Sequence, residues 1–228
     1  PTRLSSDLNK RANLVKNSAL LLVDIQNDFC TGGALAVNES EMVIQIANQL
    51  INGFKQTKSP IIASLDWHPA DHLSFAKNSG TVVGEIGKLN GLPQVWWPVH
   101  CVQNSHGATF HPELNHTLIN HIIYKGQNRL IDSYSAFFDN DHEYQTGLHT
   151  LLQTLNIKHL YILGIATDYC VKFTVLDALQ LGYQVSVITD GCRGVNIQDN
   201  DSQVALEEMQ AKGATLIDSA LWFNRNNQ

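Results

Sequence analysis

Reactive side chains stand directly after four short apolar segments of the chain. Asp24 follows the first segment, Asp66 and His68 follow the second, and Lys125 follows the third. The fourth segment leads within a few residues to Cys170. If these segments are parallel strands, their carboxyl ends meet at one edge of a sheet, so an acid, a lysine, a thiol and metal-type ligands converge there. This convergence predicts an active site.

Cys170 is the candidate nucleophile. We expect it in the first turn of the helix after the fourth segment, where unpaired N–H groups and the helix dipole favour a thiolate. Asp24 can take the thiol proton, and Lys125 can stabilise the resulting charge. Taken singly, Cys170 is more often a small buried hydrophobe, Asp24 a helix cap and Lys125 a surface charge. Their expected meeting favours the catalytic interpretation.

A second group has the residue types of a catalytic metal site. Asp66 and His68 are two residues apart, so both side chains point to one side of an extended segment, and His100 can supply a third ligand. Three protein ligands leave a position open for water or substrate. One divalent ion is expected, with zinc favoured and iron or manganese as alternatives. His72 is a weaker candidate for a fourth ligand, because its spacing also suits a residue that only orients the loop.

The remaining cysteines and histidines are expected to lie outside the site. Four cysteines are too few for a disulfide scaffold in a chain of 228 residues, so we interpret them as reduced thiols. The other histidines have no partner at metal-ligand spacing, and we expect surface or hydrogen-bonding roles. The residues concerned are Cys30, Cys101, Cys192, His106, His111, His116, His121, His142, His149 and His159.

Six apolar segments, too short for helices, are predicted to be buried strands, and several are rich in Val and Ile. They are Ala19–Val23, Pro60–Leu65, His121–Tyr124, His159–Leu163, Gln184–Thr189 and Thr215–Ile217. Between the first two, apolar residues recur every four positions from Met42 to Phe54, and Asn38 with Glu41 resembles a capping arrangement. This segment is predicted to be a helix.

Two further segments, Asp168–Leu181 and Ser202–Lys212, have helical character and end near Gly182 and Gly213, which suit the left-handed position after a helix. Strands and helices therefore alternate. The alternation predicts a three-layer α/β/α sandwich with a mainly parallel, Rossmann-like sheet of six strands. The aperiodic segment Ala76–Trp97, with four glycines, is expected to be a long surface excursion that helps to form a pocket wall.

Composition narrows the classes of protein. With 43% hydrophobic residues the chain can bury one core, so residues 19–228 are expected to form a single domain after a polar extension at 1–18. A net charge of −6 without a long basic run argues against nucleic acid as a partner. The extension holds no apolar stretch for a signal peptide or membrane span, so a cytoplasmic protein is expected. The sequence leaves open whether the protein forms a homo-oligomer.

Several motifs occur in an order that matches a known family. They are DIQNDF at 24–29, DWHPADHLSF at 66–75, WPVHC at 97–101, the lysine after the third strand, YSAF at 134–137 and GIATDYCV at 164–171. This set resembles the nicotinamidase family of isochorismatase-like cysteine hydrolases from about Ala19 to Ile217. Each motif alone is weak, but the ordered combination is highly specific. The polar segment before Ala19 is longer than the family pattern.

The resemblance implies roles for the residues identified above and for a few others. It implies a catalytic triad of Asp24, Lys125 and Cys170 and a metal site of Asp66, His68 and His100. It also implies a cis peptide bond between Ile165 and Ala166, with the N–H groups of Ala166 and Cys170 directed at the substrate oxygen. Phe29, Trp97 and Tyr134 could each flank a flat ring or be ordinary core aromatics, and a pocket role is favoured for Phe29 and Trp97 only.

The implied activity is hydrolysis of nicotinamide to nicotinate and ammonia through a thioester on the cysteine, in NAD salvage, with pyrazinamide as a further substrate. The implied task of the ion is to hold the pyridine nitrogen. A related cysteine hydrolase acting on a carbamoyl or ureido group would not need the metal ligands, so these argue against it. A non-enzymatic metal or nucleotide-binding protein on the same scaffold is a second alternative, but no GxGxxG or phosphate-loop motif supports it.

Overall fold

The computed structural model of the protein describes residues 17–226. Residues 1–16, which make up most of the predicted N-terminal extension, lie outside this range, so the proposed boundary at residue 19 stays a prediction. Within the described range, the first strand begins at Ser18. None of the helices in that range is long and apolar enough to cross a membrane.

A parallel sheet of six strands forms the centre of the molecule, with strand order β5-β2-β1-β6-β7-β8. Most residues of its inner strands are buried because helices cover both faces. All six predicted strands are confirmed, and β7 runs four residues further than predicted. The strands are β1 Ser18–Val23, β2 Ile61–Asp66, β5 His121–Lys125, β6 His159–Ile165, β7 Gln184–Arg193 and β8 Thr215–Ile217.

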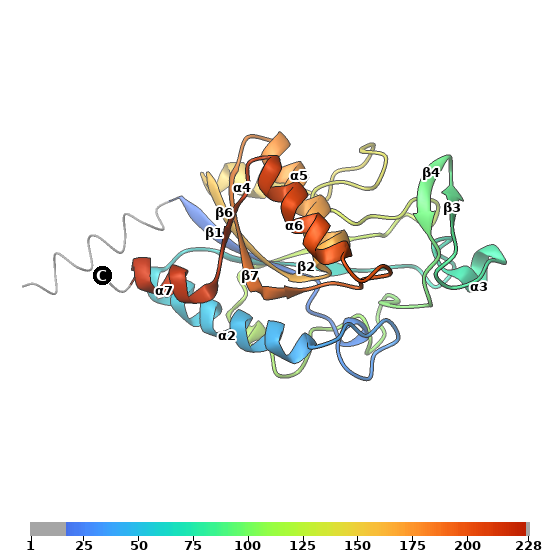
Figure 1. Ribbon diagram of the computed structural model, residues 1–228, viewed down its shortest axis with the longest axis horizontal. Coiled ribbons are helices and arrows are strands. Elements are labelled where there is room, and N and C mark those ends of the chain that lie inside the picture. The colour runs from blue at the N-terminus through green and yellow to red at the C-terminus, as the bar shows by residue number, and fades with distance from the viewer. Residues whose placement is uncertain (1–16, 227–228) are drawn as a thin grey trace, which may run out of the picture.

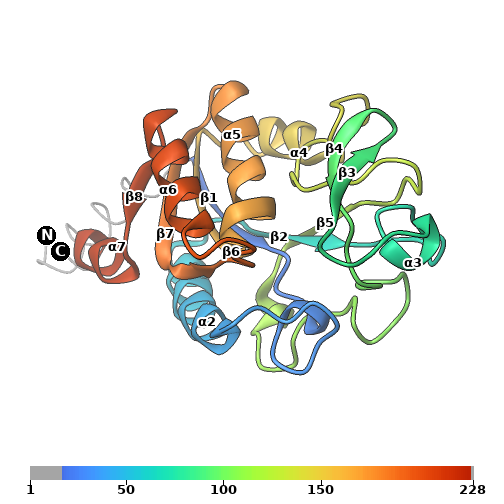
Figure 2. The same ribbon diagram turned by 45° about the vertical axis from the view of Figure 1, so that its right-hand side comes forward.

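Helices cover the two faces of this sheet, which confirms the predicted three-layer sandwich (Figure 1). The helices α2 (Ser40–Thr57) and α7 (Ser219–Asn226) pack on one face. The opposite face carries α4 (Leu148–Thr154), α5 (Lys172–Gln180) and α6 (Asp201–Ala211), as the turned view in Figure 2 also shows. Gly182 and Gly213 have φ angles of 87° and 113°, as predicted for residues that follow a helix.

The helix α2 is present as predicted, but its buried face differs from the expected one. Met42 is 42% exposed, and the inward face is shifted by one residue toward Val43 and Ala47, with Leu50 and Phe54 retained. A four-residue spacing drifts around a helix of 3.6 residues per turn, so it marks the core face only approximately. No side-chain hydrogen bond caps the first turn, so the predicted capping arrangement is wrong.

The segment Ala76–Trp97 is not aperiodic. It contains a short helix, α3 (Ala76–Ser79), and an antiparallel hairpin of β3 (Ile86–Leu89) and β4 (Leu92–Val95). Asn90 and Gly91 form the turn with φ angles of 51° and 82°, so the Asn-Gly pair was the available sequence signal. The hairpin stands beside the sheet (Figure 2). Its residues Ile86, Pro93, Gln94 and Val95 contribute to the wall of a pocket.

Candidate active site

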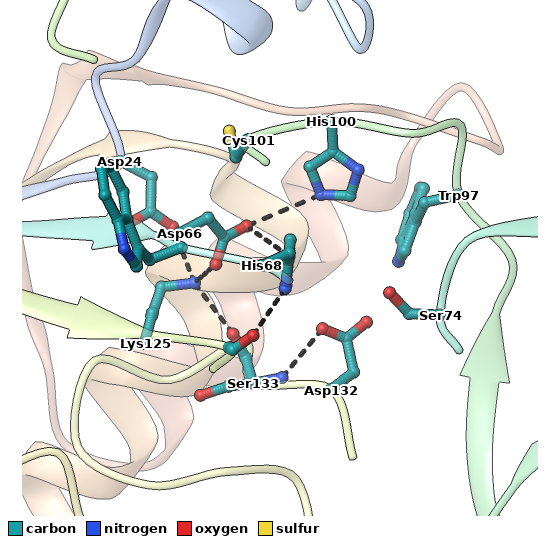
Figure 3. A network of polar contacts seen from close by, with 12 residues as sticks. Asp24, Asp66, His68, Ser74, Trp97, His100, Cys101, Lys125, Asp132 and Ser133 are labelled. Carbon is teal, nitrogen blue, oxygen red and sulfur yellow. Dashed lines mark hydrogen bonds and ion pairs between the residues drawn. The ribbon is translucent and has the colours of Figure 1, made fainter. Parts of the chain in front are cut away.

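Asp24, Asp66 and Lys125 meet at the carboxyl edge of the sheet (Figure 3). Asp66 and Lys125 are the last residues of the paired strands β2 and β5, and Asp24 follows β1. Asp24 has a φ of 52°, an uncommon conformation for a residue with a Cβ atom and one that clusters at functional sites. Ligand atoms of Asp24, Asp66 and Cys170 lie within 4.8 Å of one another. The sheet therefore joins residues that are up to 146 positions apart.

Lys125 lies at the centre of this group and is 1% exposed. Its Nζ is 2.9 Å from Asp24 Oδ2 and 2.5 Å from Asp66 Oδ1, and it donates to the carbonyl oxygen of Ser133 at 2.9 Å. Cys170 Sγ lies 3.5 Å from the same nitrogen. Burial alone would lower the pKa of Lys125, but the two carboxylates raise it well above its ordinary value. The ammonium group therefore stays charged.

Asp24 has the properties of a general base. It is fully buried, and this burial raises its pKa above the ordinary value, although Lys125 acts in the opposite direction. Ser64 Oγ donates to Asp24 Oδ1 at 2.6 Å. Asp24 Oδ2 is paired with Lys125 by charge but receives no well-directed hydrogen bond. That oxygen is the acceptor left for a proton from Cys170.

Cys170 differs in one respect from the sequence expectation. It lies in a π-helical turn (Thr167–Val171), which precedes α5, and not in the first turn of a regular helix. Burial raises the pKa of the Cys170 thiol well above its ordinary value, while Lys125 lowers it. The expectation that this thiol ionises easily at its position is therefore wrong. Proton transfer to a neighbouring base is needed, and Asp24 supplies one.

The predicted metal ligands also meet in the structure. Asp66 Oδ2 is 3.4 Å from His68 Nε2 and 3.7 Å from His100 Nε2. All three residues are buried. The Nδ1 atom of His68 lies 2.8 Å from the carbonyl oxygen of Gly126, and that of His100 lies 2.7 Å from the carbonyl oxygen of Pro98. Carbonyl oxygens only accept, so each Nδ1 carries a proton.

The two Nε2 atoms are consequently unprotonated in the neutral rings, and their lone pairs face a carboxylate. His68 Nε2 is buried and has no hydrogen-bond partner. Three electron-rich atoms turned toward one another are stabilised when a cation lies between them, and carbonyl oxygens that orient the ligand histidines are typical of metal sites. The residues present therefore fit a divalent metal ion, and the set of two nitrogens and one oxygen suits a catalytic site.

His72 lies beside this group but has a different hydrogen-bonding pattern. Its ring is 4.5 Å from that of His68, centre to centre. The N–H of Ser74 donates to His72 Nδ1 at 3.1 Å, so the proton is on Nε2, which lies 3.3 Å from the carbonyl oxygen of Ile131. Burial lowers the pKa of His72 to about 4. In this arrangement both ring nitrogens of His72 face main-chain partners, and its ring packs against that of His68.

A pocket opens onto both groups, and aromatic rings form much of its wall. Phe29 and Trp97 line it as predicted, and Tyr134, for which no pocket role was favoured, lines it too. Sequence reasoning missed several further lining residues because no local pattern marks them. The lining residues are Phe29, Leu35, Asp66, Trp97, His100, Asp132, Tyr134, Ala166, Tyr169, Cys170 and Val195.

The remaining sequence expectations concern the main chain and the other cysteines and histidines. The peptide bond between Ile165 and Ala166 is cis, as the resemblance implied. Cys30, Cys101 and Cys192 are buried and free, as expected for small hydrophobes. Several histidines make hydrogen bonds elsewhere, among them His142 with Asp177, His149 with Tyr183 and His159 with Ser186.

Comparison with known proteins places the chain in a family. The model of the isochorismatase domain matches residues 18–220, so the chain belongs to the isochorismatase domain family. A nicotinamidase of Escherichia coli is 57% identical over 204 residues, which cover 90% of this chain and 96% of that protein.

Solved structures agree with this assignment. The Acinetobacter baumanii nicotinamidase pyrazinamidase matches with a TM-score of 0.86 and 42% identity over 91% of this chain and 98% of that one. The Pyrococcus horikoshii pyrazinamidase, solved in complex with zinc, matches with a TM-score of 0.73 and 36% identity over 89% of this chain and 99% of that one. The fold and the family are therefore those of the isochorismatase-like hydrolases.

Proposed function

We propose that this protein is a nicotinamidase, which hydrolyses nicotinamide to nicotinate and ammonia in NAD salvage and also accepts pyrazinamide. The observation that carries the proposal is the position of Lys125, which contacts Asp24, Asp66 and Cys170 at once. Because Asp66 also faces the two histidines, the nucleophile and the metal group form one connected site. The identity to named nicotinamidases supports the same activity.

The residues support a two-step acyl transfer. Asp24 accepts the proton of the Cys170 thiol, and the sulfur attacks the carboxamide carbon. Lys125 holds both partners, and we propose that the N–H groups of Ala166 and Cys170 stabilise the oxyanion, each by about 3 kcal/mol. Asp24 returns the proton to the departing nitrogen, the C–N bond breaks, and ammonia and a thioester result.

Hydrolysis of the thioester uses the same groups in reverse. Water attacks the acyl carbon and gives a proton to Asp24, the C–S bond breaks, and the proton passes to the Cys170 sulfur. Asp24 therefore acts twice as a base and twice as an acid, which suits its raised pKa. The products are nicotinate and the enzyme in its starting state.

We propose that one divalent ion, zinc in the first instance, is held by Asp66, His68 and His100. When bound, the ion supplies a Lewis-acid site for the pyridine nitrogen of the substrate. Zinc is favoured by the ligand set and by its presence in the related pyrazinamidase, with iron and manganese as alternatives. Phe29 and Trp97 flank the ring, and the small aromatic amide is the only partner that the proposal requires.

The proposal is tested by ammonia release from nicotinamide in the wild type, in Cys170→Ala and in Cys101→Ser. Cys170→Ala removes the atom that forms the thioester, so turnover should fall by about 10⁴-fold or more while fold and metal content are kept. Cys101→Ser is the matched control because Cys101 is buried beside the ligand His100 but belongs to neither group. Its activity and metal content should stay close to the wild type. Near-normal turnover in Cys170→Ala would refute the mechanism.

A further inference from the structure

A buried carboxylate outside the reacting groups connects the pocket to the loop that follows β7. Asp168 is 6% exposed and lies two residues before Cys170. Its Oδ1 accepts the N–H of Val195 at 2.9 Å, and its Oδ2 accepts the N–H of Asn196 at 2.7 Å. Val195 lines the pocket together with Cys170. We propose that Asp168 is a positioning residue that fixes the Val195 wall and thereby restricts the site to unsubstituted aromatic amides, an inference that rests on the proposed function.

The hydrogen-bond partners of Asp168 indicate this role. Within residues 17–226 no ion pair to Asp168 is formed by lysine, arginine or histidine, and nearby Lys172 is paired with Glu208 at 3.4 Å. A buried carboxylate requires hydrogen bonds or opposite charge, and here two main-chain N–H groups satisfy one oxygen each. The carboxylate of Asp168 therefore acts on the loop 194–196 and not on another side chain.

The loop is held from its other side by α6. Asn196 has a φ of 51°, and its Oδ1 accepts the N–H of Ser202 at 2.9 Å. A Cβ atom on Gly194 would lie 1.9 Å from Ser202 Oγ, so only glycine allows this close approach. Val195 itself is only partly buried, so core packing alone does not determine its position. The hydrogen bonds from the loop to Asp168 determine the position of Val195.

Val195 contributes an aliphatic side chain to the wall of the pocket that also holds the proposed nucleophile and metal ligands. Cys170, Ala166, Asp66 and His100 line the same pocket. Under the proposed function the carboxamide of the substrate meets Cys170 while its ring nitrogen meets the ion, so bulk added to the ring must displace a wall residue. One methyl group in an apolar pocket changes binding by about 10- to 200-fold, and a wall held in place rejects the larger ring. Release of the loop should weaken this rejection.

The test is the selectivity of Asp168→Asn between nicotinamide and its 5-methyl and 6-methyl derivatives. An amide has one acceptor oxygen, so its NH₂ group would face one of the two loop N–H groups. One of the two hydrogen bonds between residue 168 and the loop 194–196 would then be lost. We expect KM for nicotinamide to rise about tenfold with kcat within about threefold, as for loss of one hydrogen bond to a charged group. The ratio of kcat/KM for nicotinamide to that for at least one methyl derivative should fall by about fivefold or more.

Val195→Ala tests the same wall without touching the carboxylate. It should lower the selectivity ratio in the same direction, and the double variant should show less than the sum of the two effects because both act through one wall. If Asp168→Asn does not fold, Val195→Ala decides the question. An unchanged ratio in Val195→Ala would overturn the proposal.

Asp177→Asn is the matched control. Asp177 is a buried carboxylate on α5, 7% exposed, and it accepts a hydrogen bond from His142 at 2.9 Å. The substitution should lower the melting temperature but leave the selectivity ratio unchanged. If Asp168→Asn behaves in the same way, its carboxylate has only a structural role and the proposal is wrong.

Amide hydrogen exchange separates this inference from the proposed function. In Asp168→Asn the N–H groups of Val195 and Asn196 should exchange at least about tenfold faster than in the wild type, whatever the substrate is. Unchanged exchange would show that Asp168 does not hold the loop 194–196, even in an active enzyme. A wild type that releases no ammonia from nicotinamide would refute the proposed function. The exchange result would still test whether Asp168 holds the loop 194–196.

Discussion

Asp66 connects the two halves of the site through its two carboxylate oxygens. Oδ1 pairs with Lys125, and Oδ2 faces His68 and His100. Burial alone would raise the pKa of Asp66, but the charge of Lys125 holds it well below its ordinary value. Asp24 shares the same lysine yet has a raised pKa. The two carboxylates thus differ in role, one permanently ionised and one able to carry a proton.

Ser64→Ala should shift the acidic limb of the pH profile of kcat/KM upward by about one pH unit. The Ser64 hydroxyl donates to Asp24 and so stabilises the ionised carboxylate, which lowers its pKa. Removal raises the pKa further, and since Asp24 must be ionised to act as a base, activity appears at higher pH. One unit corresponds to about 1.4 kcal/mol, the value of one hydrogen bond.

Ser64→Thr is the control for this experiment because it keeps the hydroxyl group. Its acidic limb should stay at the wild-type position, above the ordinary carboxylate pKa of 3.8. A limb that is identical in Ser64→Ala and in the wild type would show that Ser64 does not tune Asp24.

Benzamide should be a poorer substrate than nicotinamide by about a hundredfold or more in kcat/KM. It has the same shape but a C–H group in place of the ring nitrogen, and a site built for a polar atom rejects an isostere that lacks it. In His68→Ala, metal content should fall and the gap between the two substrates should shrink. Equal hydrolysis of both amides by the wild type would show that the ion does not recognise the pyridine nitrogen.

The turn after β5 orients His68, one of the proposed metal ligands. Gly126 has a φ of 70°, and its carbonyl oxygen lies 2.8 Å from Nδ1 of His68. A Cβ atom at this position would lie 2.4 Å from Cε1 of the same ring. The end of β5 therefore provides Lys125 and, one residue later, a support that only glycine can form.

Gly126→Ala should lower metal affinity by about 10- to 100-fold, because the methyl group displaces the His68 ring. Metal content after dialysis against a buffered zinc solution measures the effect. Gly80→Ala is the matched control, since Gly80 has a similar φ of 66° but nothing within 4 Å of its Cβ position. Both variants carry the same backbone strain, so equal metal loss in the two would contradict the steric explanation.

At the scale of the whole molecule, the C-terminal helix α7 closes the layer below the sheet (Figure 1). Trp222 is 2% exposed and stacks on Phe54 of α2 with 5.1 Å between ring centres. Gly53 makes room for the indole, because a Cβ atom there would lie 2.7 Å from it. None of these residues lines the pocket. Packing of α7 therefore concerns stability and not chemistry.

Trp222→Ala should lower the free energy of unfolding by about 3–5 kcal/mol, the usual cost of removing a large buried aromatic side chain. Turnover per folded molecule should stay within about twofold of the wild type. Denaturant unfolding and active-site titration measure the two quantities. Leu221→Ala, at a neighbouring position that is 37% exposed, should cost much less. Equal destabilisation by both would mean that the stacking on α2 contributes little.

The six central strands and the reactive residues at their ends were predictable from the amino-acid sequence. Those strands are short apolar segments whose pattern is local, and parallel strands place their carboxyl ends at one edge whatever the loops do. Asp24, Asp66, Lys125 and Cys170 were therefore identifiable from their place after a strand. Asp66, His68 and His100 were predicted as one group from their ligand types and, for Asp66 and His68, from their spacing.

The contacts and pKa values of these residues could be known only from the three-dimensional arrangement. Contacts between distant segments make Lys125 the shared partner of two carboxylates. They also bury Cys170, which raises the pKa of its thiol, and they join Asp168 to Val195 in the pocket wall. The pKa of a side chain depends on desolvation and on the charge of every neighbour, and a pocket wall depends on which loop packs there. Neither property produces a periodic pattern in the sequence. The sheet edge was predictable because it follows from local hydrophobic pattern, whereas its electrostatics required the three-dimensional arrangement.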